Sequence, residues 1–318
     1  MSDKGFLDDS SMIGIVFSRD RAFQLDGLLR SFFLHCRDWE TLKLCVLYKA
    51  TSDLHTRQYA DLRQAYAQHP VRFISEKTFK DDLLKLLDGS AQHPRKRALY
   101  SLEERLGRWF GYPFHLFTPP RGSETILFLV DDNIFVRPFE LEEISAALTS
   151  QVNAVGFSLR LGTNTTHCYP LDKPQALPEF VPVRDRVVGF RWAGAEGDFG
   201  YPLEVSSSVY RLQELLPLLV MLPYANPNQL EEQLARRAKK FRRRAPLLAC
   251  FRQSVTFCNP VNRVQTMLDN RVGSLREYSS EGLAEMFAAG YRLDVDAYHD
   301  FVPVSCHQEA DVAVRKGL

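Results

Sequence analysis

The sequence has no excess of charge of either sign. Its 318 residues include 40 lysines and arginines and 39 aspartates and glutamates, a net charge of +1. Such a chain is not drawn as a whole to nucleic acid or to anionic membranes, so a charged partner must meet a local patch. No apolar run approaches the length of a membrane-spanning helix. The first residues, MSDKGFLDDSS, lack the basic and apolar parts of a signal peptide. We expect residues 1–11 to be a disordered tail and the chain to be cytoplasmic.

Paired cysteines and two nucleotide-binding signatures are also missing. The six cysteines form no C-x-x-C pair, and several lie in apolar segments, which indicates reduced core residues rather than disulfides or a zinc site. No G-x-G-x-x-G follows the first predicted strand, and no G-x-x-x-x-G-K-[ST] occurs. These absences argue against dinucleotide-binding and P-loop proteins. A nucleotidyltransferase is a weaker alternative, since the first strand is not followed by a glycine-rich loop that carries a lysine.

The first half of the chain alternates between strand-like and helix-like patterns. The predicted strands lie at 12–17, 42–48, 71–75 and 126–130, and the predicted helices lie around 25–33, 53–68, 79–87 and 101–110. This alternation is typical of an α/β protein with a parallel sheet. We expect Ser18 or Asp20 to cap the first helix.

The second half is less regular. We expect helices at 139–148, 211–222, 229–241 and 281–289 and strands at 152–162 and 254–258. The segment 163–204 is rich in proline, glycine and threonine and has no clear periodicity, so it is interpreted as a lid or binding loop.

Two acids interrupt the most apolar segment of the chain. In ILFLVDDNIFV, residues 126–136, five apolar residues precede Asp131 and Asp132. An uninterrupted apolar run is typical of a strand that is buried on both faces. Ligands bind at the carboxyl ends of strands in open α/β sheets, and two adjacent carboxylates there repel unless a cation or donors lie between them. A divalent metal is therefore the first candidate, although such a pair can also be a helix cap or a solvated turn.

This arrangement resembles the nucleotide-sugar glycosyltransferases of the GT-A fold. VDDNIF is similar to a loose form of their D-x-D motif, although Asn133 stands where many members have another acid. The resemblance implies a Rossmann-like, mixed, mostly parallel sheet flanked by helices. It also implies that Asp131 contacts the ribose or base, and that Asp132, with Asp131, holds Mn²⁺ or Mg²⁺ beside the diphosphate. His307, in VSCHQE, is the candidate third metal ligand, against the more common structural role of a lone histidine.

The loop after the first strand, FSRDR, also resembles the first loop of these enzymes. We expect its residues to contact the nucleotide; they are Phe17, Ser18, Arg19, Asp20 and Arg21. Forked arginine donors and the free N–H groups of a helix N-terminus both suit phosphate oxygens. The alternative is that Asp20 only caps the helix and pairs with an arginine.

Two acids of the second half are candidates for a catalytic base. In NPNQLEE, Asn228 and Glu231 have the spacing of a capping box, which would occupy Glu231 and leave Glu232 free. Asp198, in the long loop EGDFGYP, is the second candidate. A carboxylate is required within hydrogen-bond reach of the attacking hydroxyl if the transfer inverts the anomeric carbon.

A basic segment lies at 236–244. It contains seven basic residues, which are Arg236, Arg237, Lys239, Lys240, Arg242, Arg243 and Arg244. A solvated helix face is the default interpretation. Anionic lipid headgroups at the inner membrane face or a phosphorylated acceptor would lower the mutual repulsion of these charges. Nucleic acid is disfavoured because aromatic residues are not interleaved with the charges.

Four segments of the second half are similar to a more specific group. DFGYPLEVSSSVYR, YANPNQLEEQL, VNRVQTMLDNRVG and GLAEMFAAGYRLD resemble the majastridin-like group of bacterial proteins, which are regarded as GT-A glycosyltransferases. This chain departs from the group at residues 204–206. We expect one domain with a nucleotide-binding half (12–137) and an acceptor-binding half (138–318), which transfers a sugar from a nucleotide-diphosphate donor to a hydroxyl. The main alternative is a non-catalytic nucleotide-sugar-binding or scaffold protein, favoured by Asn133 and by the altered 204–206 segment.

Overall fold

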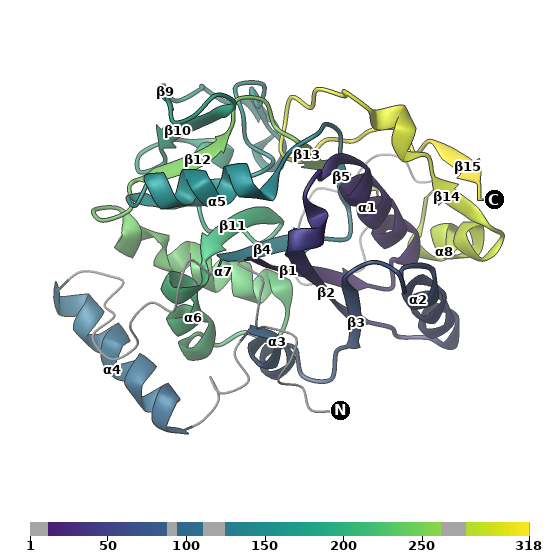
Figure 1. Cartoon of the computed structure of the whole chain (residues 1–318), viewed down its shortest axis with the longest axis horizontal. Coiled ribbons are helices and arrows are strands. Elements are labelled where there is room, and N and C mark those ends of the chain that lie inside the picture. Colours follow the sequence, from purple (N-terminus) through teal and green to yellow (C-terminus); the bar gives the residue numbers. More distant parts are fainter. Residues whose placement is uncertain (1–11, 88–93, 111–124, 262–277, 318) are drawn as a thin grey trace.

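The structure, a computed structural model, describes residues 12–87, 94–110, 125–261 and 278–317. The predicted tail at 1–11 lies outside the described residues, as does most of the segment VNRVQTMLDNRVG. Figure 1 shows a central sheet with helices packed around it.

One nine-stranded sheet organises the chain. Its order is β3 (Val71–Ser75), β2 (Leu42–Lys49), β1 (Met12–Arg19), β4 (Thr125–Val130), β11 (Ser207–Arg211), β6 (Ala154–Ser158), β12 (Leu247–Phe251), β10 (Val187–Arg191) and β9 (Phe180–Pro182). Only β11 and β10 run against the direction of the others, so the sheet is mixed but mostly parallel. The predicted fold class is confirmed.

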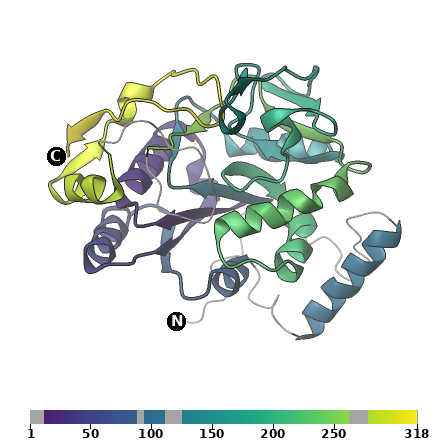
Figure 2. The same cartoon turned by 180° about the vertical axis from the view of Figure 1, so that it is seen from behind.

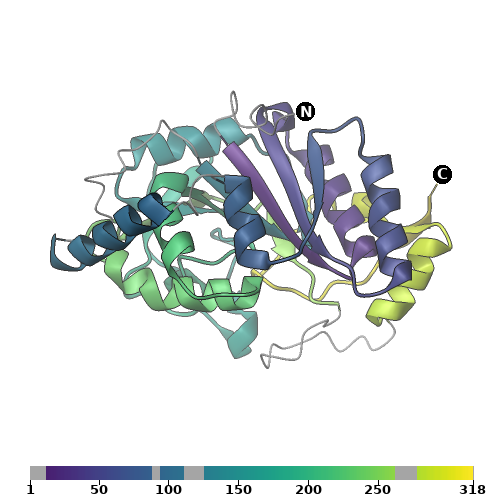
Figure 3. The same cartoon turned by 90° about the horizontal axis from the view of Figure 1, so that it is seen from below.

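Helices cover both faces of the sheet, as Figure 3 shows. One core lies under α1 (Ala22–His35), α2 (Asp53–Ala65), α5 (Leu141–Ser150) and α8 (Ser280–Ala288). The other lies under α3 (Phe79–Leu87), α4 (Pro94–Phe110), α6 (Leu212–Met221) and α7 (Pro227–Ala238). In Figures 1 and 2, α4 is the outermost of these helices.

Shorter elements complete the chain. Three two-stranded sheets pair β5 (Asn133–Phe135) with β13 (Thr256–Cys258), β14 (Tyr291–Leu293) with β15 (Val314–Lys316), and β7 (His167–Cys168) with β8 (Lys173–Pro174). The 3-10 helices are η2 (Trp39–Thr41), η3 (Tyr169–Leu171), η4 (Gly197–Gly200), η5 (Lys239–Phe241) and η6 (Val295–Tyr298).

Burial on both faces explains the apolar run of β4. Leu127 and Leu129 lie in one core, and Ile126 and Phe128 lie in the other. Each fully buried side chain of this size contributes about 1.5–3 kcal/mol to folding. A strand in this position has no solvent-facing side on which polar residues could alternate.

Three sequence-based predictions were wrong or incomplete. The segment 163–204 is not only a loop, because β9 and β10 extend the sheet there. The strands β11 and β12 were not predicted; both are short. Neither Ser18 nor Asp20 caps α1, because the N-cap residue is Arg21 and no side chain accepts a hydrogen bond at that end.

The sheet is continuous across the boundary predicted near residue 137. Strand β4 pairs with β11, where Leu129 lies opposite Ser207 and Thr125 opposite Arg211. The division into a nucleotide-binding and an acceptor-binding half stays a prediction, and the two halves share one sheet.

A distant carboxylate caps α5. Asp38 accepts hydrogen bonds from the backbone N–H groups of Leu141 at 2.8 Å and Glu142 at 2.9 Å. We expect Asp38→Asn to lower the free energy of unfolding by about 1 kcal/mol, because an amide cannot accept both bonds. Urea unfolding checks this, with Asp61→Asn on the exposed face of α2 as the control. Equal stability of the two variants would contradict the assignment.

Candidate functional site

The two acids lie where the central strands end. Asp131 directly follows β4, and its backbone N–H donates to the carbonyl of Phe17 on β1 at 3.1 Å. Phe17 and Val130 are register partners of these parallel strands. The pairing therefore places the acidic pair beside the loop that follows β1, as the sequence predicted.

Arg21 joins the two carboxylates. Its Nη1 lies 3.1 Å from Asp131 Oδ1 and 3.5 Å from Asp132 Oδ2. Asp131 Oδ2 also accepts from the backbone N–H of Arg19 at 3.3 Å. Burial raises the pKa of Asp131, and the charge of Arg21 acts against this increase. One arginine thus compensates two adjacent acids.

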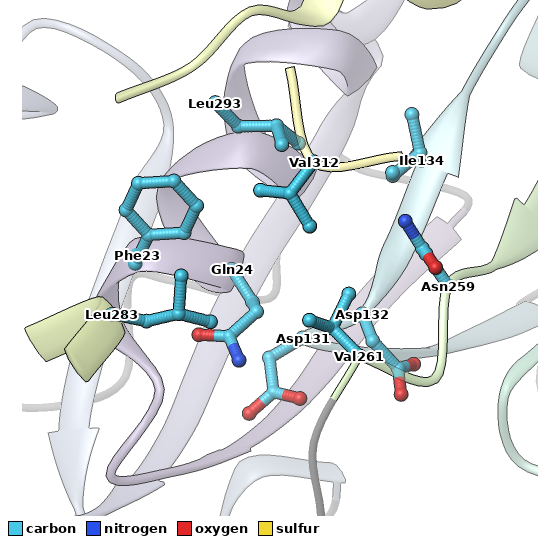
Figure 4. A pocket seen from close by; sticks show the side chains of 10 residues that line it. All are labelled: Phe23, Gln24, Asp131, Asp132, Ile134, Asn259, Val261, Leu283, Leu293 and Val312. Atoms are coloured by element: carbon cyan, nitrogen blue, oxygen red, sulfur yellow. The ribbon is translucent and has the colours of Figure 1, made fainter. Parts of the chain in front are cut away.

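Asp132 is the more accessible acid. Its side chain is 19% exposed, against 5% for Asp131. Burial, with a smaller contribution from Asp131, raises the pKa of Asp132 to about 6, although Arg21 acts in the opposite direction. Both acids line a pocket that is partly open to solvent. Figure 4 shows them at one end of this pocket, with Leu293 and Val312 at the other.

Asn133 has a structural role. It is fully buried, its Oδ1 accepts from the N–H of Val130 at 2.9 Å, and its Nδ2 donates to the thiol of Cys258 at 3.2 Å. Its amide therefore closes the turn after β4 and connects this turn to β13.

The loop after β1 is held by its own contacts. Phe17 packs in the core between the rings of Phe79 and Phe128, so only its backbone is near the acids. The hydroxyl of Ser18 lies 2.6 Å from the buried hydroxyl of Tyr59, which accepts from the N–H of Arg21 at 3.3 Å. The helix α2 thereby fixes the conformation of the loop.

The side chains of Arg19 and Asp20 make polar contacts with residues other than Tyr59. Asp20 has a φ of 55°, and its carboxylate accepts from the N–H and hydroxyl of Thr51 at 2.7 and 2.9 Å. This carboxylate anchors the loop after β2. Arg19 is half exposed and lies 3.8 Å from Asp20. Nucleotide contacts of these residues stay a prediction, and Arg19 has the more accessible side chain.

A second polar cluster surrounds Arg160. This arginine is only 5% exposed, and its Nη2 lies 3.5 Å from Glu204 Oε2. Its charge also acts on Asp132, Asp198 and Glu231. The two clusters are therefore neighbours, with Asp132 influenced by both Arg21 and Arg160.

Asp198 lies in this second cluster. It is on η4, and it exchanges two hydrogen bonds with Gln175: Gln175 Nε2 donates to Asp198 Oδ2 at 3.3 Å, and the N–H of Asp198 donates to Gln175 Oε1 at 2.9 Å. Burial raises the pKa of Asp198. The predicted candidate is thus near Arg160, in a fixed orientation.

The choice between Glu231 and Glu232 is corrected. The N-cap of α7 is Asn226, which accepts from the N–H of Gln229 at 2.9 Å, so the predicted capping box of Asn228 and Glu231 is wrong. Glu231 instead accepts from the N–H of Val205 at 2.9 Å. Glu232 is on the exposed face of α7 and pairs with Arg236. The reason for preferring Glu232 as a base therefore falls away.

His307 faces an arginine rather than the acidic pair. Its Nε2 lies 3.3 Å from Arg160 Nη1, and burial together with Arg160 lowers its pKa to about 3. Within the described parts of the chain, no three or more His, Cys, Asp or Glu side chains are placed to hold a metal. The predicted metal-binding roles of Asp131, Asp132 and His307 stay a prediction.

Sequence reasoning missed Arg160, although a signal was present. Strand β6 runs in the same direction as β4, since both are antiparallel to β11. The carboxyl ends of β4 and β6 therefore lie at the same edge of the sheet. Arg160 comes two residues after β6, in GFSLRLG. Asp131 and Asp132 were selected because ligands bind at the carboxyl ends of strands in open α/β sheets, and the same argument applies to Arg160.

The basic segment 236–244 is on the surface. Arg236 and Arg237 are in the last turn of α7, where positive charge is favourable to the helix dipole. The exposed members are Arg236, Lys239, Arg242, Arg243 and Arg244. No helix in the described residues has both the length and the apolar character needed to cross a membrane.

Comparison with known proteins finds a glycosyltransferase. The chain is 23% identical over 312 residues to the bifunctional glycosyltransferase pgtA of Dictyostelium discoideum, a match that covers 90% of this chain and 36% of that protein. The chain thus spans about a third of the length of this relative. No family model matches the chain. The predicted resemblance to glycosyltransferases is confirmed, while the majastridin-like group stays a prediction.

Several solved structures resemble this chain at low sequence identity. S. aureus TarS 1–349 in complex with UDP has a TM-score of 0.42 and 12% identity, with 77% of this chain and 59% of that chain covered. The mannosyltransferase PcManGT from Pyrobaculum calidifontis, in complex with GDP-Man and Mn²⁺, has a TM-score of 0.38 and 9% identity, with 76% and 55% covered.

The two arginines of the first loop allow a matched test of the charge bridge. We expect Arg21→Met to lower the free energy of unfolding at neutral pH by about 3 kcal/mol, because it removes the guanidinium that contacts two buried carboxylates. Arg19→Met is the control and should cost less than about 1 kcal/mol, since its ion pair is half exposed. Denaturant unfolding of both variants measures the difference. Equal losses would show that Arg21 does not stabilise the pair.

Proposed function

We propose that the chain is a metal-dependent glycosyltransferase that moves a sugar from a nucleotide-diphosphate donor to a hydroxyl group. One observation carries the proposal: Asp131 and Asp132 end the central strand β4 beside the loop after β1, with Arg21 between them. The similarity to a glycosyltransferase over 90% of the chain supports it.

The residues present fit a divalent cation. Mg²⁺ and Mn²⁺ are commonly bound by one or two carboxylates and complete their coordination with water and substrate phosphate oxygens. A cluster of three protein ligands is therefore not required. Asp132 would hold the ion, because its carboxylate is the more exposed, and Asp131 would contribute to the site's negative charge. When bound, the ion supplies positive charge that stabilises the departing diphosphate.

The residues of the first loop would bind the rest of the donor. Arg21 can exchange part of its contact with the acids for the diphosphate, because a bound cation would compensate the carboxylates in its place. Forked guanidinium donors match phosphate oxygens well. The hydrogen bonds among Ser18, Tyr59 and the N–H of Arg21 orient the backbone of this loop.

A scaffold protein was favoured by Asn133 and by the altered segment 204–206, and both features have structural explanations. Asn133 is buried in a turn, and a ligand role for it is not needed. Glu204 accepts from the N–H groups of Ser206 and Ser207, and it keeps an acid beside Arg160. Neither position therefore supports a degenerate site. A nucleotidyltransferase is distinguished by its products, because it would release pyrophosphate from a nucleoside triphosphate.

We place the protein in the cytoplasm, with an anionic surface or a phosphorylated acceptor as the partner of the basic segment 236–244. Each basic residue near an acidic membrane contributes about 1 kcal/mol to binding. The exposure of the segment supports this partner, since five of its seven basic residues are exposed, one in the last turn of α7 and four after it.

Asp132→Ala tests the metal assignment. We expect it to abolish the Mn²⁺-dependent part of UDP binding, at least a tenfold loss of affinity, while the thermal unfolding temperature stays near that of the parent protein. Titration calorimetry with UDP, with and without Mn²⁺, measures this. Asp61→Asn is the control for general charge effects. Unchanged UDP affinity of Asp132→Ala in the presence of Mn²⁺ would refute the proposal.

The raised pKa of Asp132 predicts a pH dependence. Only the ionised carboxylate binds a cation, so Mn²⁺-dependent affinity for a nucleotide sugar should decrease as the pH falls through about 6. The free energy of unfolding depends on the ionisation of Asp132 in the opposite direction. Protonation favours the folded state, so this group's stabilising contribution is greatest below its ordinary pKa of 3.8 and is lost as the pH rises through about 6. A nucleotide sugar is the suitable ligand, because its diphosphate has no proton that titrates in this range. An affinity that does not change between pH 7 and pH 5 would contradict the prediction.

A further inference from the structure

Glu231 is held at the border between the polar cluster and the surface. It lies in the first half of α7, and its Oε2 accepts from the N–H of Val205 at 2.9 Å. The hydroxyl of Tyr201 also hydrogen-bonds to it, and this tyrosine is 37% exposed. Two contacts from the segment before β11 therefore fix the carboxylate, and one of them reaches the surface.

The other acids of the cluster are less available for chemistry. Glu204 is 3% exposed, and its two oxygens accept from the N–H groups of Ser206 and Ser207 and from the hydroxyl of Ser208. Asp198 is tied to Gln175 through two hydrogen bonds. Glu231 is the acid of this cluster that has a partner on the surface.

The position of Glu231 also relates it to the acidic pair. Arg160 interacts electrostatically with both Asp132 and Glu231. Arg160 therefore links Glu231 electrostatically to the predicted donor site. Glu204 faces the same arginine at 3.5 Å, so two glutamates share one counter-charge. This excess of negative charge favours the uptake of a proton by one of them.

We propose that Glu231 is the general base that takes the proton from the acceptor hydroxyl; the assignment rests on the proposed glycosyl transfer. As the hydroxyl oxygen forms its bond to the anomeric carbon, the bond from that carbon to the diphosphate breaks, and the pair of electrons leaves with the diphosphate. The hydroxyl proton passes to the carboxylate of Glu231. The hydroxyl of Tyr201 and the N–H of Val205 keep this carboxylate oriented.

The direction of the pKa shift is consistent with this role. Burial raises the pKa of Glu231, and the negative charge of Glu204 adds to the increase, while Arg160 lowers it. A carboxylate with a raised pKa is a stronger base, which is the condition for efficient proton removal near neutral pH.

The test compares five proteins: the parent chain, Glu231→Gln, Glu231→Asp, Glu232→Gln and Glu142→Gln, the last on the exposed face of α5. Glutamine keeps an oxygen that can accept from Val205, so the fold of Glu231→Gln is expected to be retained. Each protein is incubated with Mn²⁺ and a panel of UDP- and GDP-sugars. Hydrolysis of the donor, in which water takes the place of the acceptor hydroxyl, is followed between pH 5 and pH 8 by the nucleoside diphosphate released. Donor affinity is measured by calorimetry.

We expect Glu231→Gln to bind the donor as the parent does and to release the diphosphate about 100-fold or more slowly, without the acidic limb of the parent's pH profile. Glu231→Asp should recover part of the rate, and Glu142→Gln should behave as the parent. A rate for Glu231→Gln within about threefold of the parent would overturn the assignment alone. The same holds if Glu232→Gln, the competing acid, loses the activity instead. No binding of any donor by the parent protein would overturn the proposed function and this assignment together.

Discussion

The structure at the carboxyl edge of the sheet depends on how Arg21 compensates Asp131 and Asp132. Two adjacent carboxylates are buried at the end of a central strand, and one guanidinium contacts both. The loop that carries Arg21 is fixed by Tyr59 on α2, and Asp20 attaches it to Thr51 after β2. The acids thus tie three neighbouring strands together at the place where a ligand would bind. Under the proposed function, a donor with a cation would replace part of this charge pairing, so binding would change the site at this bridge.

A second arginine extends this arrangement toward α7. Five acids are distributed around the two arginines; they are Asp131, Asp132, Asp198, Glu204 and Glu231. Burial raises the pKa of Asp131, Asp132, Asp198 and Glu231. Repulsion by a neighbouring acid adds to the increase for Asp132 and Glu231. Such a site favours a divalent cation and the uptake of a proton.

The sequence was most informative where burial dictates the residue pattern. The apolar runs of β1 and β4 allowed the parallel sheet and the position of Asp131 and Asp132 to be predicted, because strands that are covered on both faces have no polar alternation. Strands β9 and β10 were missed, since they are short and lie in a segment rich in proline and glycine.

The residues of the second polar cluster were harder to predict. Glu231 was rejected because its spacing to Asn228 indicated a capping box, whereas the helix begins two residues earlier and Asn226 is the cap. Local spacing does not fix where a helix begins. Arg160 lies at the same edge of the sheet as Asp132 because the antiparallel strand β11 separates two strands of the same direction, a pairing that no local pattern contains.

The pairing of β4 with β11 also limits how the protein can move. Five register pairs, from Thr125 opposite Arg211 to Leu129 opposite Ser207, join the strand that ends in the acidic pair to the strand that follows Glu204. Two lobes connected by a flexible hinge could open and close around a substrate, but a shared sheet cannot bend in this way without breaking its ladder of hydrogen bonds. Under the proposed function, a donor would therefore be admitted by rotation of side chains and displacement of loops, while the shared sheet keeps its shape.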